Sequence, residues 1–152
     1  MDSSRKEPYL IRGGLSIDDR GQLTFVNELR FDNIRRFYVV ENFSTEVVRA
    51  FHGHLKEEKF IFPLTGSAIV AAVEMEAESR ANPNAKMHRY VLSSRQPCVL
   101  HIPAGYANGF RALERGTKLL FFSTVTVEES SKDDYRFKYD RWGIDVWQSE
   151  NR

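Results

Sequence analysis

The longest run of strand-forming residues is "KFIFPLTGSAIVAAVEM", residues 59–75. It is rich in phenylalanine, isoleucine and valine, whose aromatic or branched side chains favour the extended backbone of a β-strand. Runs of similar composition lie on both sides of it, and glycine, proline, asparagine or aspartate separates most of them. No segment has apolar residues at helical spacing over the length of an ordinary helix. Many short strands with frequent turn signals predict an all-β sandwich or barrel, with strands expected at 21–29, 34–42, 47–55, 59–75, 88–94, 98–103, 109–113 and 117–127.

Two polar segments are expected to lie outside these strands. The segment "EAESRANPNAK" (76–86) is predicted to be an exposed loop, because its Asn-Pro-Asn sequence disfavours both helix and strand. The segment "EESSKDDYRFKYDR" (128–141) is predicted to be a solvated, irregular tail whose tyrosines dock on the sandwich.

The composition restricts the class of protein and its partners. A chain of 152 residues is expected to fold as a single domain, residues 1–152. Its 22 lysines and arginines nearly balance its 21 acidic residues, so no net field attracts nucleic acid or an anionic membrane. The single cysteine, Cys98, excludes an intramolecular disulfide, and no apolar run is long enough for a signal peptide or a membrane span. We therefore expect a soluble, cytoplasmic protein.

The segment "RAFHGHLKEEKF" (49–60) contains the polar residues that suggest a binding site. His52 and His54 are two residues apart, so on a strand their side chains leave the same face. Arg49 and Lys59 lie close to them in sequence. If the strand continued without a break, the same face would also carry Glu58, Phe60 and Phe62, although "LKEE" (55–58) could equally form a turn. Two histidines on the inner face of a barrel predict the mouth of a ligand pocket.

The same histidines leave a metal site open as an alternative. His-x-His followed by a carboxylate resembles the first ligand motif of metal-binding cupins, and "PAGYANGF" (103–110) resembles the second, Pro-x-Gly-x-x-His. Asn108 stands where that second motif has its histidine, and asparagine is a poor ligand for transition metals. The remaining donors for an open three-ligand site are His52, His54 and Glu58. Our principal expectation is a site without metal or other cofactor.

Five motifs follow one another along the chain: "DDRG" (18–21), "RAFH" (49–52), "KFIF" (59–62), "IPAGYANGF" (102–110) and "WGIDVW" (142–147). In this order they resemble the motifs of dTDP-4-dehydrorhamnose 3,5-epimerases. A sister group, the dTDP-4-keto-6-deoxyhexose 3,4-ketoisomerases and WxcM-like proteins, is similar to "IDDRGQLTFVNELRFDNIRRFYVVENF" (17–43) and "DDYRFKYDRW" (133–142). The resemblance covers roughly residues 17–147 and implies a jelly-roll β-sandwich of the cupin type.

This resemblance implies roles for individual residues. Arg20 and Arg49 would hold the diphosphate, because a guanidinium binds phosphate oxygens through two parallel hydrogen bonds. His52 matches the base of the epimerases, which removes a proton beside the 4-keto group. Lys59 matches the lysine that stabilises the resulting enolate. Because Arg49 has the opposite parity to His52, we expect it at a bulge or just before the regular strand.

Two further matches point to the ketoisomerases. His54 stands where they carry a second histidine, which makes it the alternative base. Tyr38 matches the tyrosine that they place on the preceding strand. The expected catalytic residues are therefore His52, Lys59, His54 and Tyr38.

Two departures from the epimerase pattern narrow the expected reaction. Phe121 stands where epimerases have the tyrosine that returns a proton to the opposite face of the sugar, and Asn108 replaces their histidine. Both residues are still expected to line the substrate-binding part of the pocket. We therefore expect a reaction with one base, either epimerisation at a single carbon or 3,4-ketoisomerisation.

The resemblance also implies a substrate and a partner. The substrate would be a dTDP-linked 4-keto-6-deoxy sugar, used in the biosynthesis of a surface polysaccharide. Edge strands with few blocking charges, such as "LTFVNEL" (23–29), favour a homodimer. Three alternatives remain: a metal-dependent cupin enzyme, a catalytically silent sugar-nucleotide binding or regulatory protein, and a non-catalytic subunit fused or paired with an acyltransferase.

Overall fold

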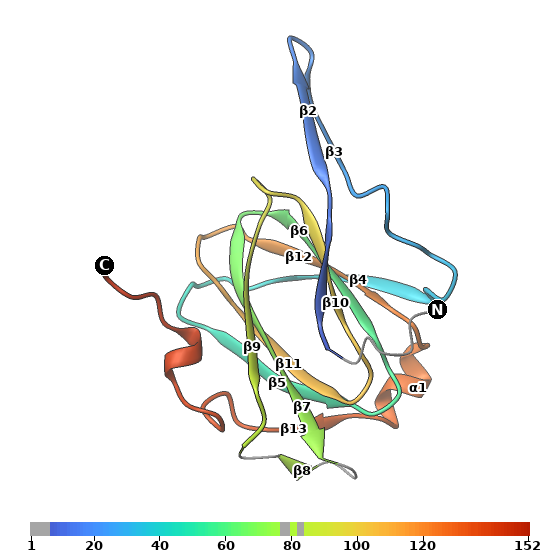
Figure 1. The fold of residues 1–152 in the computed structure, drawn as a ribbon, viewed down its shortest axis with the longest axis vertical. Helices are drawn as coiled ribbons and strands as arrows, with labels where there is room; N and C mark the ends of the chain where they lie inside the picture. Colours follow the sequence, from blue (N-terminus) through green and yellow to red (C-terminus); the bar gives the residue numbers. More distant parts are fainter. Residues whose placement is uncertain (1–6, 77–79, 82–83) are drawn as a thin grey trace.

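The chain forms two antiparallel β-sheets that pack face to face, and a two-stranded hairpin that projects from them (Figure 1). The computed structural model describes residues 7–76, 80–81 and 84–152. The first sheet has the order β1 (Tyr9–Arg12), β10 (Cys98–Ile102), β6 (Lys59–Thr65), β12 (Lys118–Ser123), β4 (Arg36–Glu41). The second has the order β13 (Tyr135–Arg136), β5 (Val48–His54), β11 (Tyr106–Ala112), β7 (Ser67–Glu76), and β7 also pairs with β8 (Arg80–Ala81) and β9 (Met87–Ser93). The expectation of an all-β sandwich is confirmed. Among the described residues, no helix is both long and apolar enough to cross a lipid bilayer.

The expected strand 59–75 is in fact two strands that belong to different sheets. The break is at Gly66, whose φ of +76° favours glycine. A Cβ there would also lie 2.9 Å from the Cα of Thr117. The residues on either side are strand-forming, so only the single glycine marks the corner. The chain passes from the first sheet to the second at this point.

The expected strand 117–127 ends early, because its last residues begin a helix. β12 stops at Ser123, and Thr126 is the N-cap of α1 (Val127–Ser131). The Thr126 hydroxyl accepts a hydrogen bond from the Glu129 amide at 3.2 Å, and the Glu129 carboxylate accepts one from the Thr126 amide at 3.0 Å. This capping box satisfies two amides of the first turn and explains why a five-residue helix forms at this place.

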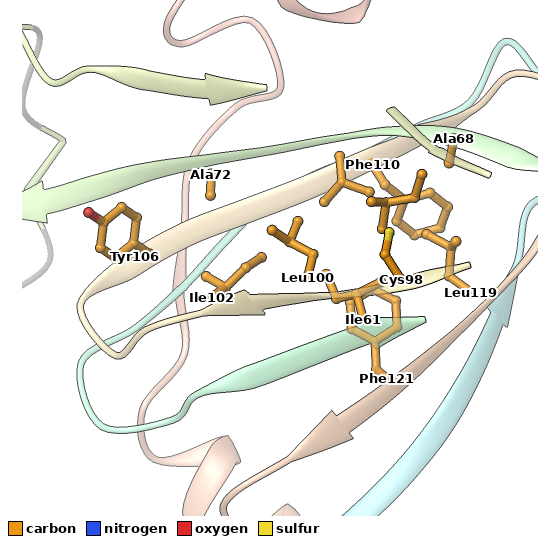
Figure 2. Close-up of a cluster of buried hydrophobic side chains, with 12 residues drawn as sticks. Ile61, Ala68, Ala72, Cys98, Leu100, Ile102, Tyr106, Phe110, Leu119 and Phe121 are labelled. Atoms are coloured by element: carbon orange, nitrogen blue, oxygen red, sulfur yellow. The ribbon is translucent and has the colours of Figure 1, made fainter. Parts of the chain in front are cut away.

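An apolar cluster fills the space between the two sheets (Figure 2). On β7, Val70 and its alternate neighbours belong to this cluster, whereas Ile69 and Val73 face the opposite side and pack under Trp147. A strand that is buried on both faces has no polar positions. This double burial explains why "AIVAAV" (68–73) is a continuous apolar run instead of an alternating one.

The C-terminal segment covers the outer face of the second sheet, so the prediction of an irregular tail at 128–141 is wrong in part. α1 and β13 lie within these residues, and Phe137 exchanges backbone hydrogen bonds of 2.8 and 3.0 Å with Phe51. Tyr135 and Phe137 pack on the cluster around Trp147, which lies in the 3₁₀ helix η2 (Asp145–Trp147). The alternation of aromatic and basic residues in "YRFK" (135–138) was the strand signal that the polar composition concealed.

The predicted loop at 76–86 is only partly described. Arg80 and Ala81 form β8 and pair with Glu76 and Met75 of β7, so this part is a strand and not a loop. Residues 77–79 and 82–83 lie outside the described residues.

Candidate active site

A pocket of about 310 Å³ opens between the two sheets, beside α1. β4, β6 and β12 of the first sheet contribute to its walls, and β5 and β11 form the facing wall from the second sheet. The pocket brings together seven of the eight predicted site residues, and Arg20 is absent from it. Its lining residues are Arg36, Tyr38, Val40, Arg49, His52, His54, Lys59, Asn108, Gly109, Phe110, Phe121, Val127, Ser130, Ser131 and Asp134.

The β5 wall carries both histidines on one face, as their spacing predicted. Arg49 also reaches the pocket, because a bulge reverses the parity of the strand. Asn108 of β11 pairs with His52, whereas Phe110 pairs with Arg49, so three steps on β5 lie opposite two steps on β11. An extra residue of this kind turns the following side chain to the other face. The prediction that Arg49 lies at a bulge is confirmed.

Close backbone contact at the bulge fixes two polar side chains. Gly109 faces it, and a Cβ at this position would lie 2.6 Å from the Arg49 carbonyl oxygen. The Arg49 Nε–H donates to Asn42 Oδ1 at 2.6 Å, which orients the guanidinium on the pocket wall. Asn108 Nδ2–H donates to the carbonyl oxygen of His52 at 3.4 Å. Asn108 therefore ties β11 to β5 at the position where the epimerase pattern has a histidine.

On the facing wall, the Lys59 ammonium lies over two aromatic rings. Its Nζ is 5.8 Å from the centroid of Tyr38 and 5.7 Å from that of Phe121. Aromatic faces attract a cation without neutralising its charge. No carboxylate within the described ranges forms an ion pair with Lys59. The ammonium is therefore a buried positive charge available to an anionic oxygen in the pocket.

The turn at 55–58 breaks the parity on which the three-ligand metal site depended. Glu58 Oε1 lies 2.7 Å from Nε2 of His101, and Phe60 packs edge-on against the same imidazole at 4.6 Å. Lys59 takes the pocket position instead. The structure has the turn that "LKEE" (55–58) left open, so Glu58, Phe60 and Phe62 do not share the face of the histidines, and the alternative in which Glu58 completes a metal site is wrong. The described part of the chain contains no group of three or more histidine, cysteine or acidic side chains that could hold a metal ion.

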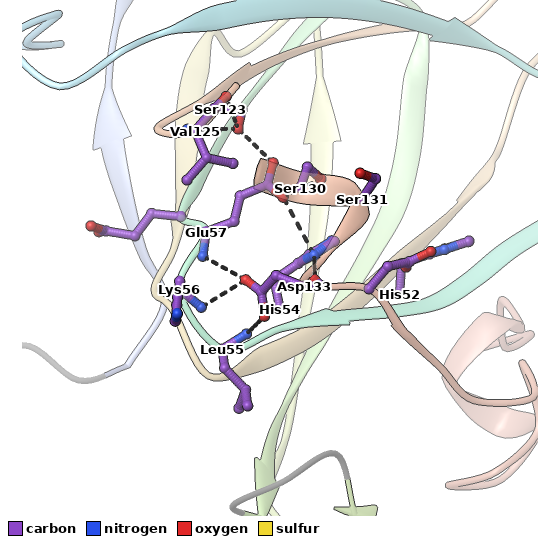
Figure 3. A network of polar contacts seen from close by, with 12 residues as sticks. His52, His54, Leu55, Lys56, Glu57, Ser123, Val125, Ser130, Ser131 and Asp133 are labelled. Carbon is purple, nitrogen blue, oxygen red and sulfur yellow. Dashed lines mark hydrogen bonds and ion pairs between the residues drawn. The ribbon is translucent and has the colours of Figure 1, made fainter. Parts of the chain in front are cut away.

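The neighbouring glutamate, Glu57, is the acidic residue that reaches His54 (Figure 3). Its Oε1 lies 3.3 Å from Nδ1 of His54, and its side chain is fully buried. Ser130 Oγ–H donates to Oε1 at 2.7 Å, Ser123 Oγ–H donates to Oε2 at 2.5 Å, and Arg36 donates to Oε2 at 3.2 Å. Both carboxylate oxygens therefore accept hydrogen bonds, which is what a buried negative charge requires.

Asp133 holds the turn that positions Glu57. Its carboxylate accepts hydrogen bonds from the amides of residues 55, 56 and 57 at 2.8, 2.8 and 3.2 Å (Figure 3). Its backbone carbonyl accepts a hydrogen bond of 2.5 Å from Nδ1 of His54. Sequence reasoning missed Glu57, Asp133, Ser130 and Arg36 as site residues. The signal available for Glu57 was its position three residues after His54, but "EE" (57–58) offers two glutamates for that place.

Burial lowers the pKa of both pocket histidines below the ordinary value of 6.5. For His52, the positive charges of Arg136 and Lys59 lower the pKa further. For His54, Lys59 acts in the same direction, while Glu57 and Asp133 oppose it. Both imidazoles are therefore neutral at neutral pH, and a neutral imidazole has a nitrogen that accepts a proton.

Arg20 does not enter the pocket of its own chain. It lies in the turn between β2 (Gly14–Asp18) and β3 (Gly21–Phe25), the hairpin that projects from the sandwich (Figure 1). Its side chain is 87% exposed and forms an ion pair with Asp18 at 2.5 Å. The predicted role of Arg20 in holding diphosphate is therefore not met within one chain.

Comparisons with known proteins identify the family. The family model described as dTDP-4-dehydrorhamnose 3,5-epimerase matches residues 10–151. The spore coat polysaccharide biosynthesis protein SpsL of Bacillus subtilis (strain 168) is 30% identical over 108 residues, which are 70% of this chain and 70% of that protein.

Solved structures agree in fold. The dTDP-4-dehydrorhamnose 3,5-epimerase of Sulfolobus tokodaii is 25% identical with a TM-score of 0.72, covering 91% of this chain and 82% of that one. The sugar 3,4-ketoisomerase QdtA of Thermoanaerobacterium thermosaccharolyticum, solved in complex with TDP, is 22% identical with a TM-score of 0.69, covering 94% and 96%. The expected jelly-roll sandwich is thereby confirmed. The chain belongs to the dTDP-4-dehydrorhamnose 3,5-epimerase family of dTDP-sugar isomerases.

Proposed function

We propose that this protein isomerises a dTDP-linked 4-keto-6-deoxyhexose by removing a proton beside the keto group, in the biosynthesis of a surface polysaccharide. The observation that supports this most directly is the content of the pocket. Two neutral imidazoles on β5 face a buried ammonium on β6, across a space of about 310 Å³. A base and a fixed positive charge on opposite sides of a carbonyl are what enolate formation requires.

The chemistry proceeds through an enolate. His52, or His54 in the alternative, accepts the proton from the carbon beside the ketone, and the C–H electron pair moves toward the carbonyl oxygen. The Lys59 ammonium stabilises the negative charge on that oxygen, and it is more effective in a buried site than in water. The imidazole that acts as the base and the ammonium that binds the oxyanion lie on opposite walls of the pocket. One imidazole can therefore take the proton and return it.

The residue pattern favours a reaction on one face of the sugar. In the epimerase pattern, a tyrosine at the position of Phe121 returns a proton to the opposite face of the sugar. Phe121 has no proton to donate, so this step is missing here. Tyr38, on the adjacent strand, supplies the phenol of the pocket. This supports epimerisation at a single carbon or 3,4-ketoisomerisation, and it argues against inversion at both carbons.

Arg49 is our candidate for the diphosphate. Its Nε–H donates a hydrogen bond to Asn42 Oδ1 at 2.6 Å, and Arg49 lines the pocket. A guanidinium presents two parallel donors to phosphate oxygens, which a lysine does not. Asn108 and Phe121 complete the substrate-binding surface.

We propose further that the protein acts as a homodimer and that Arg20 serves the pocket of the second copy. Ile17 and Leu23 of the projecting hairpin are 70% and 63% exposed. On the outer face of the first sheet, Phe37 and Val39 of β4 are also exposed. Burying such side chains against a second copy is favourable, at roughly 25 cal/mol per Å² of apolar surface. The hairpin is long enough to leave the body of its own chain (Figure 1), which supports an exchange of this kind.

The decisive experiment is incubation with dTDP-4-keto-6-deoxyglucose, followed by NMR of the sugar. A 3-keto sugar would identify ketoisomerisation, and an inverted carbon would identify epimerisation. Binding of dTDP without turnover would favour the silent binding protein or the subunit of an acyltransferase. Loss of activity on chelation, restored by one metal ion per chain, would favour the metal-dependent alternative.

A further inference from the structure

We propose, on the basis of the function proposed above, that Glu57 is a positioning residue for His54 and that the pair makes His54 the base of the reaction. Glu57 does not line the pocket; it lies behind the imidazole, with Oε1 3.3 Å from Nδ1. It would therefore act through His54 and not on the sugar.

The contacts of the imidazole determine which nitrogen carries its proton. The carbonyl oxygen of Asp133 can only accept a hydrogen bond, and it lies 2.5 Å from Nδ1 of His54. Nδ1 must therefore carry the hydrogen, and Nε2 keeps its lone pair. Nε2 is buried and has no hydrogen-bond partner among the described residues, although His54 lines the pocket. The ring is thus oriented as a base whose accepting nitrogen has no partner among the described residues, on a side chain that lines the pocket.

The carboxylate behind this ring is held rigidly. Donors from three separate elements converge on it: Ser123 from β12, Ser130 from α1 and Arg36 from β4. Asp133 adds a hydrogen bond to the Glu57 amide at 3.2 Å. A carboxylate fixed in this way needs no reorganisation when charge develops beside it.

The charge that develops is that of the imidazolium. When Nε2 takes the proton from the carbon beside the ketone, the C–H electron pair forms the enolate and His54 becomes positive. Glu57 then faces a cation on one side, as Lys59 faces the anion on the other. Return of the proton from Nε2 to the former keto carbon, with the hydroxyl proton passing from one sugar oxygen to the other, completes a 3,4-ketoisomerisation without any oxidant or reductant.

His52 lacks a comparable partner. No hydrogen bond to its ring occurs within the part of the chain that the structure describes, and Arg136 and Lys59 both oppose its protonation in addition to burial. The charged groups that act on His54 are Glu57 of its own turn, Lys59 of β6 and Asp133 after α1. The other titratable or charged side chains of the same pocket are Arg36, Tyr38, Arg49, His52 and Asp134. Of the carboxylates, Glu57 is the one whose oxygen lies beside Nδ1.

The test is Glu57→Gln, with Glu58→Gln as the matched control. Both remove one carboxylate that contacts a histidine, but Glu58 contacts His101 on the other face of the sheet. We expect Glu57→Gln to lower kcat by about 10- to 100-fold, a part of what a general base contributes, with KM and dTDP affinity within about twofold of wild type. Glu58→Gln should leave all three unchanged. Glu57→Asp, which keeps the charge but withdraws it from Nδ1, should retain more activity than Glu57→Gln.

A second measurement separates this inference from the proposed function. In ¹H–¹⁵N NMR of the free protein, the titration midpoint of His54 should move to lower pH in Glu57→Gln, because a carboxylate that favours the imidazolium is lost. The midpoint of His52 should move less. If the wild-type protein shows no turnover, the proposed function is refuted. The His54 titration then tests, independently of activity, whether Glu57 acts on His54. Equal kcat for both glutamine variants, or an unmoved His54 midpoint, would overturn the inference.

Discussion

The rings of Tyr38 and Phe121 lie parallel in the pocket, with centroids 5.0 Å apart and planes 6° from parallel. They are directly opposite each other on β4 and β12. Cross-strand neighbours on one face point the same way, so the phenol of Tyr38 lies beside the position where the epimerase pattern has its tyrosine. The pocket therefore has a tyrosine one strand away from the position at which the epimerase pattern has its own.

We expect Tyr38→Phe to lower kcat by about 10²-fold or more, because a proton donor in the pocket is lost. The stacked pair should remain, so dTDP affinity should stay close to wild type. Steady-state kinetics and calorimetry with dTDP measure the two effects. Tyr90→Phe is the control, because the Tyr90 hydroxyl donates to the Pro8 carbonyl outside the pocket. Equal turnover in the two variants would remove Tyr38 from the mechanism.

Phe121→Tyr tests whether the missing hydroxyl limits the reaction to one face. In deuterium oxide, the variant should invert the substrate more often than wild type, while the rate of hydrogen exchange beside the ketone stays the same. The base that starts exchange is unchanged, whereas a donor has been added on the far face. Mass spectrometry and NMR of the sugar report exchange and configuration. Phe122→Tyr, whose ring points to the other side of β12 and contacts Phe31, should change neither.

Arg49→Lys should weaken dTDP binding by about 10- to 100-fold, the effect of losing one charge-assisted hydrogen bond. The lysine keeps the charge but loses both the fork and the contact with Asn42. Titration calorimetry with dTDP gives the affinity, and thermal unfolding shows whether the bulge survives. Arg95→Lys, at the exposed pair with Glu114, is the control and should bind normally. Unchanged affinity in Arg49→Lys would place the diphosphate elsewhere.

The lowered histidine pKa values predict the pH dependence of activity and stability. The neutral, active form of each imidazole persists below pH 6.5, so kcat/KM should hold at that pH and fall only through the lower pKa of the folded state. Because the folded state binds fewer protons than the unfolded chain in this range, the free energy of unfolding should also decline as the pH falls from 6.5 toward that pKa. Rate profiles and denaturant unfolding test this. An acidic limb centred at or above pH 6.5 would contradict it.

Mixing two inactive variants tests the exchange of Arg20 between copies. Arg20→Ala should lose dTDP affinity, and His54→Asn should lose catalysis, each with the fold intact. If Arg20 serves the partner's pocket, a mixed dimer contains one pocket that has both changes and one that has neither. Co-refolded mixtures should then regain up to about one quarter of wild-type activity, because half of the dimers are mixed. A mixture that stays inactive would contradict the proposal that Arg20 serves the pocket of the second copy.

Much of the fold was determined by the sequence by itself. Strand formation follows from local composition, and the separation of His52 from His54 by two residues places them on one face of any strand. The bulge at Arg49 was predicted from the family resemblance, because a residue of opposite parity to His52 reaches the pocket face only where the ladder is interrupted. The strands and the shared face of the two histidines needed no such resemblance. These are properties of a few neighbouring residues, so they do not depend on the rest of the chain.

Tertiary structure alone decided which glutamate meets the histidine. Glu57 and Glu58 are adjacent and chemically identical, and the conformation of the turn between β5 and β6 chooses between them. That turn is held by the carboxylate of Asp133, which lies 76 to 78 residues further along the chain from the amides that it binds. The position of Arg20 has the same origin, because the direction of a hairpin depends on how its base leaves the sandwich. Contacts between distant segments leave no local periodicity, and the sequence pattern therefore could not predict them.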